Sequence, residues 1–130
     1  MSTNQSYKPE GYSTVSPYVI VQGAASSIFF IKQVFGAAEL RRFTDEAGNI
    51  RHAEVQLRDT VIMLADSGNG WDPTSSHLHV YVPDVDATYE HALEAGGTSV
   101  QEPQKKDDED KRGGVRGPGG ITWWIATRVE

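Results

Sequence analysis

Four side chains of this sequence suit acid–base or metal chemistry, and they occur as two pairs with strand spacing: His52 with Glu54, and His77 with His79. Residues two apart in a strand share a face, so each pair presents its polar groups side by side. Two imidazoles and a carboxylate form a known metal donor set, provided that the two strands are adjacent. Without a metal, His77 or His52 would be a general base oriented by Glu54 through a contact of about 2.6–3.2 Å. The spacing predicts which side chains share a face of a strand, but not the distances between strands. A metal site and a metal-free general base therefore both stay open.

A third possibility is capture of an organic molecule by flat, polarizable side chains. Tyr18, Met63, Tyr81 and Trp124 fall on predicted strands, and Trp71 lies in the turn-rich segment 66–76, from which it could close over a ligand. Aromatic walls hold planar or cationic molecules by stacking and cation–π attraction. The net charge of -6 would steer a cation modestly. This interpretation predicts an aromatic or cationic ligand.

Composition excludes several other classes of function. The acidic balance argues against binding of duplex nucleic acid, which needs a basic face. The absence of cysteine removes thiolate nucleophiles, disulfides and cysteine-ligated metals. The sequence contains neither of the two Gly-rich nucleotide-binding patterns, G-x-G-x-x-G and G-x-x-x-x-G-K-[ST], and it has no serine elbow motif. No run approaches the roughly 20 apolar residues of a membrane span, so we expect a cytoplasmic protein without a membrane partner.

The elements that must position these residues follow from hydrophobic periodicity. Residues 1–11 are predicted to be a flexible arm and residues 12–130 a single domain. Helical spacing over 24–35 runs through Ala25, Ile28, Phe29, Val34 and Phe35, and a second helix is predicted over 85–95. The charged run 104–112 is predicted to be a solvated loop, and 117–120 a turn. Strands are predicted over 13–21, 38–43, 50–58, 61–65, 77–82, 98–101, 113–116 and 121–127.

An internal repeat determines the predicted architecture. Ser16 and His77, Val21 and Val82, Gly36 and Gly97, and Met63 and Trp124 all lie 61 residues apart. The two members of each pair fall at the same place in the predicted order of elements, either in a strand or at the end of a helix. The order β-α-β-β-β therefore occurs twice, in modules at about 12–70 and 73–128. The predicted fold class is α+β, with two βαβββ modules forming curved mixed sheets around a concave cleft and helices on the outer face.

The faces turned away from the helices supply the predicted ligand-binding residues. Trp123 takes the helix-facing register of the last strand, which leaves Trp124 for the cleft. Together with the loop residue Trp71, the predicted set is Ser16, Tyr18, His52, Glu54, Met63, Trp71, His77, His79, Tyr81 and Trp124.

The sequence resembles the vicinal oxygen chelate superfamily, which includes glyoxalase I, extradiol dioxygenases, fosfomycin-resistance enzymes and bleomycin-resistance proteins. The resemblance runs from about Tyr12 to Ala126 and is closest to the small single-domain branch. The segments that carry it are 17–21, 30–36, 51–57, 61–66, 77–85 and 115–120.

Metal enzymes of that superfamily take ligands, typically His, Gln or Glu, from the first and last strand of each module. The matching positions here are Ser16, Met63, His77 and Trp124, of which only His77 is a competent ligand. We therefore predict a homodimeric, metal-independent protein without a cofactor that sequesters a small organic molecule, in the manner of drug-binding resistance proteins. The alternative is a glyoxalase-like lyase, isomerase or dioxygenase with an irregular metal site.

Overall fold

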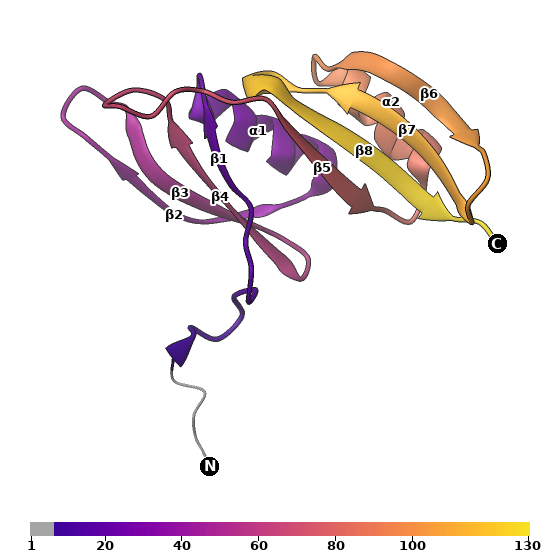
Figure 1. Cartoon of the computed structure of the whole chain (residues 1–130), viewed down its shortest axis with the longest axis horizontal. Coiled ribbons are helices and arrows are strands. Elements are labelled where there is room, and N and C mark those ends of the chain that lie inside the picture. Colours follow the sequence, from indigo (N-terminus) through magenta and orange to yellow (C-terminus); the bar gives the residue numbers. More distant parts are fainter. Residues whose placement is uncertain (1–6) are drawn as a thin grey trace.

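The computed structural model describes residues 7–130, which form two βαβββ modules placed side by side (Figure 1). The first module contains β1 (Tyr18–Val21), α1 (Ala24–Phe35), β2 (Ala38–Thr44), β3 (Ile50–Leu57) and β4 (Thr60–Asp66). The second contains β5 (Ser76–Tyr81), α2 (Val85–Glu94), β6 (Thr98–Lys105), β7 (Asp110–Arg116), the short 3-10 helix η2 (Pro118–Gly120) and β8 (Ile121–Arg128). The predicted α+β class and the doubled module are confirmed.

Each module forms an open four-stranded mixed sheet, with strand orders β1-β4-β3-β2 and β5-β8-β7-β6. In both sheets the first and last strands of the module pair in parallel, and the other neighbours are antiparallel. Tyr18 pairs with Met63 in the first sheet, and His79 pairs with Trp124 in the second. Tyr18 and His79 lie 61 residues apart, as do Met63 and Trp124, so the repeat seen in the sequence corresponds to equivalent places in the two sheets.

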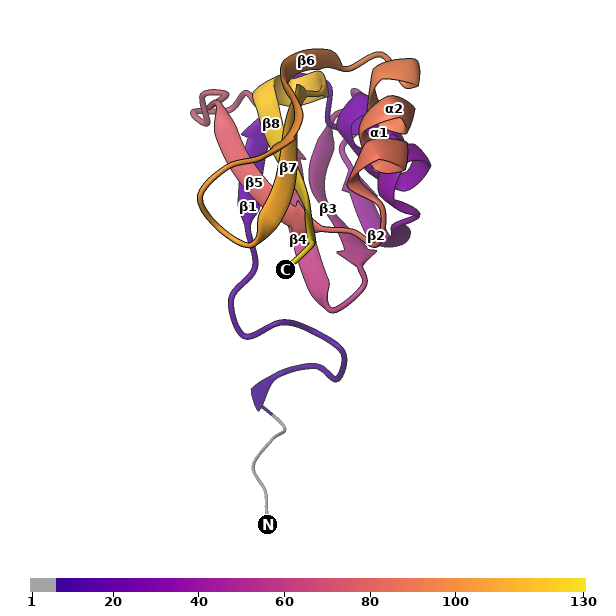
Figure 2. The ribbon, with the colours of Figure 1, turned by 90° about the vertical axis from the view of Figure 1, so that its right-hand side faces the viewer.

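Both helices lie on the same side of the sheets, which leaves the opposite faces free of helices (Figure 2). Ile28, Phe30 and Ile31 of α1 are buried in the core, whereas Phe29 is 63% exposed. The prediction that Ala25 and Phe29 belong to the apolar face was wrong, because both are exposed. The buried stripe follows Ala24, Ile28 and Ile31, at the three- and four-residue spacing of one helix face, and Phe29 falls outside it.

The turn predicted at 117–120 forms η2 and packs the second module against the first. Ser27 of α1 donates a hydrogen bond through Oγ to the carbonyl of Pro118, at 3.2 Å. A Cβ added at Gly119 would lie 2.5 Å from Ser27 Oγ and 2.9 Å from Val21 Cβ, so this close approach requires a glycine. The turn therefore joins the two modules.

Two predicted segments differ from the structure. The first strand begins at Tyr18 rather than residue 13, although Met63 N–H still donates to the Pro17 carbonyl at 2.9 Å. The predicted loop 104–112 is shorter in the structure: β6 extends to Lys105 and β7 begins at Asp110, so that only residues 106–109 connect the strands. Pro103 is tolerated within β6 because that strand is at the sheet edge, where a missing N–H leaves no neighbour unpaired.

The division into an arm over 1–11 and a domain over 12–130 stays a prediction, and residues 1–6 lie outside the described part of the chain. Tyr12, the first residue after the predicted arm, donates a hydrogen bond through its hydroxyl to Glu54 of β3. No helix among residues 7–130 has the length and apolar character needed to span a bilayer.

Candidate functional site

A hydrogen-bonded chain of side chains runs across the free face of the first sheet. Glu54 on β3 is buried and accepts hydrogen bonds from the Tyr12 hydroxyl and, at 2.7 Å, from His52 Nε2. On the other side of the imidazole, Tyr18 Oη lies 3.0 Å from His52 Nδ1. Arg41 Nε on β2 lies 3.3 Å from Glu54 Oε1. The contact between His52 and Glu54 has the length that an oriented general base requires.

The partners of His52 determine its tautomer. Burial alone would raise the pKa of Glu54, but hydrogen bonds from Tyr12 and His52 and the charge of Arg41 together hold the pKa below its usual value. An ionised carboxylate only accepts hydrogen bonds, so His52 Nε2 must carry a proton. In neutral imidazole the other nitrogen is then bare, and Nδ1 accepts the Tyr18 hydroxyl proton.

Glu54 should make the stability of the protein sensitive to acid. A carboxyl group whose pKa is lowered by folding stabilises the protein above its unfolded value, here 4.5, and the stabilisation is lost as pH falls through the lower folded value. We expect wild type to melt at a higher temperature than Glu54→Gln near pH 7, with the gap closing as pH falls below 4.5. Thermal melts of both proteins across this range would check it. A gap that stays constant would contradict the assigned role of Glu54.

The same free face is hollowed next to Tyr18, where Trp71 forms the opposite wall. The loop that carries Trp71 is tied to β1 at both ends: Ser67 N–H donates to the Val21 carbonyl at 2.8 Å and Thr74 N–H to the Ile20 carbonyl at 3.2 Å. Tyr18 is 51% exposed and Trp71 63% exposed. The resulting groove has a volume of about 480 Å³ and is lined by Tyr18, Ile20, Arg51, Ala65, Asp66, Gly68 and Trp71.

On the second sheet, the side chain of His77 contacts that of Trp124. The indole Nε1 donates to His77 Nδ1 at 3.0 Å, and the two rings are nearly parallel, at 10°. The indole lies over Gly114 on β7, where an added Cβ would be 2.7 Å from Cζ3 of the ring. Met63 pairs with Glu54 in the first sheet, and the equivalent residue Trp124 pairs with Gly114 in the second. The second module therefore has a glycine at the position where the first module has the carboxylate of Glu54.

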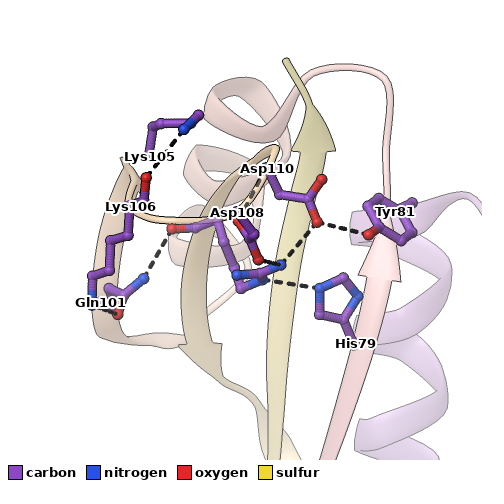
Figure 3. Close-up of polar contacts among 8 residues, drawn as sticks. His79, Tyr81, Gln101, Lys105, Lys106, Asp108 and Asp110 are labelled. Atoms are coloured by element: carbon purple, nitrogen blue, oxygen red, sulfur yellow. Dashed lines mark hydrogen bonds and ion pairs between the residues drawn. The ribbon is translucent and has the colours of Figure 1, made fainter. Parts of the chain in front are cut away.

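The remaining predicted residues of the second sheet belong to a separate ionic cluster (Figure 3). Arg112 Nη2 contacts Asp110 at 2.8 Å and Asp108 at 3.1 Å, while Arg112 Nε donates to His79 Nε2 at 3.0 Å. The Tyr81 hydroxyl donates to Asp110 at 2.7 Å. Loss of hydration, followed by the charge of Arg112, lowers the pKa of His79, which suits an imidazole that accepts from a guanidinium.

The structure thus brings the predicted site residues together in groups rather than in one cluster. On the first sheet, hydrogen bonds connect Tyr18, His52 and Glu54. On the second sheet, His77 contacts Trp124. His79 and Tyr81 belong instead to the ionic cluster around Arg112. Met63 is half-buried beside Tyr18 on β4, and Ser16 is half-buried just before β1. Among residues 7–130, no three His, Cys, Asp or Glu side chains are close enough together to hold a metal ion.

Five residues of these clusters are not among the site residues predicted from the sequence: Tyr12, Arg41, Asp108, Asp110 and Arg112. Tyr12 lies at the boundary of the predicted arm, and Asp108, Asp110 and Arg112 lie in the predicted solvated loop. The spacing of Asp110 and Arg112 indicates their contact, because residues at i and i+2 share a face wherever the charged run forms a strand.

Comparison with known proteins identifies the family. The sequence profile of the Glyoxalase/Bleomycin resistance protein/Dioxygenase superfamily matches residues 14–125. The chain belongs to this superfamily. An uncharacterised protein of Mycobacterium tuberculosis strain H37Rv is 34% identical over 127 residues, covering 89% of this chain and 75% of the relative.

Two solved structures share the fold of this chain. TioX from Micromonospora sp. ML1 superposes with a TM-score of 0.75 at 24% identity, covering 89% of this chain and 98% of TioX. TnmS3, an antibiotic-binding protein from Streptomyces sp. CB03234, gives a TM-score of 0.68 at 18% identity, covering 96% of this chain and 99% of TnmS3.

The superfamily positions that would hold a metal do not fit one in this chain. Ser16, Met63, His77 and Trp124 offer a hydroxyl, a thioether, an imidazole and an indole, whereas a divalent site needs about three or four competent donors. In addition, His77 Nδ1 already accepts the Trp124 indole proton. His52 and Glu54 do not replace these donors, because within residues 7–130 they do not come close enough to His77 or His79 to hold a metal ion together.

Proposed function

We propose that this protein is a metal-independent binding protein for a small planar aromatic molecule. The observation that carries the proposal is the groove of about 480 Å³ between Tyr18 and Trp71 on the free face of the first sheet. Pockets of this size, with aromatic walls and a few polar groups, suit drug-sized ligands. The antibiotic binding named for TnmS3, which has the same fold, supports the same class of function for this chain.

The charges around the groove refine the expected ligand. Both carboxylate oxygens of Asp66 already accept backbone N–H groups, from Ala24 and Ile50, at 2.7 Å each. Arg51 also lines the groove. A flat molecule that is neutral or carries a carboxylate therefore suits this groove better than a cation, despite the net negative charge of the chain.

Replacement of Trp71 should weaken binding of planar compounds. We expect Trp71→Ala to raise the dissociation constant of acridine-9-carboxylate about 10-fold, because one stacking wall is lost. Isothermal titration calorimetry measures the constant, and Phe29→Ala is the matched control, since Phe29 is equally exposed on α1, away from the groove. Proflavine, a cation of the same ring size, should bind more weakly than the carboxylate.

The same titration distinguishes this function from a metal-dependent one. Binding should be unchanged by EDTA, because no step of the proposed recognition uses a metal. Equal affinities for wild type and Trp71→Ala, or binding that disappears with EDTA, would contradict the proposal.

We further propose that two copies associate through their free sheet faces. Tyr18, Phe43, Trp71 and Tyr81 are all more than half exposed, and a second copy would cover much of this aromatic surface. Such pairing could bring the first sheet of one copy toward the second sheet of the other. Light scattering coupled to size exclusion should give twice the 14.3 kDa of one chain, and a monomeric mass would exclude the dimer.

A further inference from the structure

We propose that Tyr18, His52 and Glu54 form a proton relay that catalyses the interconversion of keto and enol forms of an aromatic carbonyl compound bound in the groove. This activity rests on the proposed binding site and adds chemistry to it. Tyr18 would be the catalytic residue that contacts the substrate, while His52 and Glu54 act through it. The inference depends on the geometry of the three side chains and on the position of Tyr18 in the wall of the groove.

The three side chains are connected in the order that proton transfer needs. The Tyr18 hydroxyl lies 3.0 Å from His52 Nδ1, and His52 Nε2 lies 2.7 Å from Glu54 Oε2. Glu54 is buried, whereas Tyr18 is half exposed to the groove. A buried carboxylate that fixes one tautomer of histidine, whose other nitrogen receives a hydroxyl proton, is the arrangement that activates the hydroxyl in catalytic triads.

Surrounding groups hold Glu54 in place for this role. The Tyr12 hydroxyl donates to one carboxylate oxygen and Arg41 pairs with the same oxygen, which leaves Oε2 for His52. Every buried side-chain nitrogen and oxygen among residues 7–130 has a hydrogen-bond partner. The relay is therefore preorganised, and the exposed edge of Tyr18 is the point at which a ligand can meet it.

The proposed step transfers one proton out and one proton back. The C–H bond next to the substrate carbonyl breaks, and its proton goes to the Tyr18 oxygen while the phenolic proton passes to His52 Nδ1. The electron pair of that bond forms a carbon–carbon double bond, which leaves an enolate and an imidazolium stabilised by Glu54. The imidazolium then returns its proton through Tyr18 to the enolate oxygen, so the enol forms and no co-reactant is needed.

The lining of the groove indicates the class of substrate. Trp71 offers a flat surface for an aromatic ring, and Arg51 offers a cation for a carboxylate or for the oxygen of an enolate. An aryl-substituted 2-oxo acid combines these features, since its enol is planar and its carboxylate is charged. Phenylpyruvate is a simple probe of this class.

The test measures exchange of the benzylic hydrogens of phenylpyruvate for deuterium in D2O, followed by proton NMR. We expect wild type to accelerate exchange above the buffer rate, and Tyr18→Phe or His52→Gln to lower kcat about 100-fold, the usual size of a general acid–base contribution. Tyr89→Phe and His91→Gln are matched controls on α2 and should keep wild-type rates. Tyr89 loses a comparable hydrogen bond, to Ser99, without contacting the groove.

The split between kcat and KM distinguishes a relay from a merely structural role. Tyr18→Phe and His52→Gln should lower kcat while the KM for phenylpyruvate stays near the wild-type value, whereas a distorted groove would raise KM. Exchange at the buffer rate with wild type, or full activity in Tyr18→Phe, would overturn the relay. If phenylpyruvate binds, as line broadening would show, but exchanges only at the buffer rate, the relay is wrong and the binding function stands.

Discussion

Trp123→Ala should destabilise the protein by about 3–5 kcal/mol, as expected when a fully buried large aromatic is removed, whereas Trp124→Ala should cost about 1 kcal/mol. Trp123 is 1% exposed, and its ring centroid lies 4.8 Å from that of Phe35 in α1. Trp124, the next residue of β8, faces the other way and is half-buried. Its replacement removes one hydrogen bond, to the exposed His77. Urea unfolding of the two variants measures the difference.

This pair of variants tests the register of β8 within one strand, because both remove the same indole from adjacent positions. Similar losses for the two would mean that Trp124 is also a core residue and does not belong to the free face. Far-UV circular dichroism before unfolding confirms that each variant is folded. If Trp123→Ala does not fold, Trp123→Phe gives a smaller loss that can be compared with Trp124→Phe.

Gly119→Ala should destabilise the protein by about 3 kcal/mol through two separate effects. Gly119 has φ of 79°, a left-handed conformation that costs a residue with a Cβ about 1 kcal/mol. The added methyl group would also lie 2.5 Å from Ser27 Oγ and 2.9 Å from Val21 Cβ, which forces η2 away from the first module. Chemical unfolding measures the total.

Gly48→Ala separates the two effects. Gly48 has φ of 88°, but a Cβ there would meet nothing within 4 Å, so only the conformational cost of about 1 kcal/mol is expected. An equal loss at both positions would show that the contact of η2 with α1 contributes little. A larger loss at Gly119 supports η2 as the element that docks the two modules.

Much of the fold could be predicted from the sequence because the apolar pattern repeats. The alternation around Ala53, Val55 and Leu57 predicts a core face, and all three are buried. The 61-residue repeat predicts that β1 and β5 occupy equivalent places, and the pairing of Tyr18 with Met63 and of His79 with Trp124 agrees. Faces and repeats are local properties, and the sequence carries them directly.

Contacts between strands were harder to predict, because they depend on distances that alternation does not give. The orientation of His52 by Glu54 was an open alternative, and the 2.7 Å contact provides the required geometry. Tyr12 and Arg41 come from other segments, and nothing in their local sequence indicates that they meet Glu54. Asp110 was missed for another reason: a dense run of charges is typical of a loop, and here the charges neutralise one another on a strand.

The position of a bound ligand tests most directly whether the groove between Tyr18 and Trp71 is the binding site. Titration of isotopically labelled protein with acridine-9-carboxylate, followed by amide chemical shifts, would locate it. We expect saturable shifts concentrated at Ile20, Ala65 and Gly68, which line the groove. A second groove, of about 490 Å³, is lined by residues of both modules, among them Leu57 and Leu78. Shifts confined to this second groove, or to β8 around Trp124, would contradict the assignment.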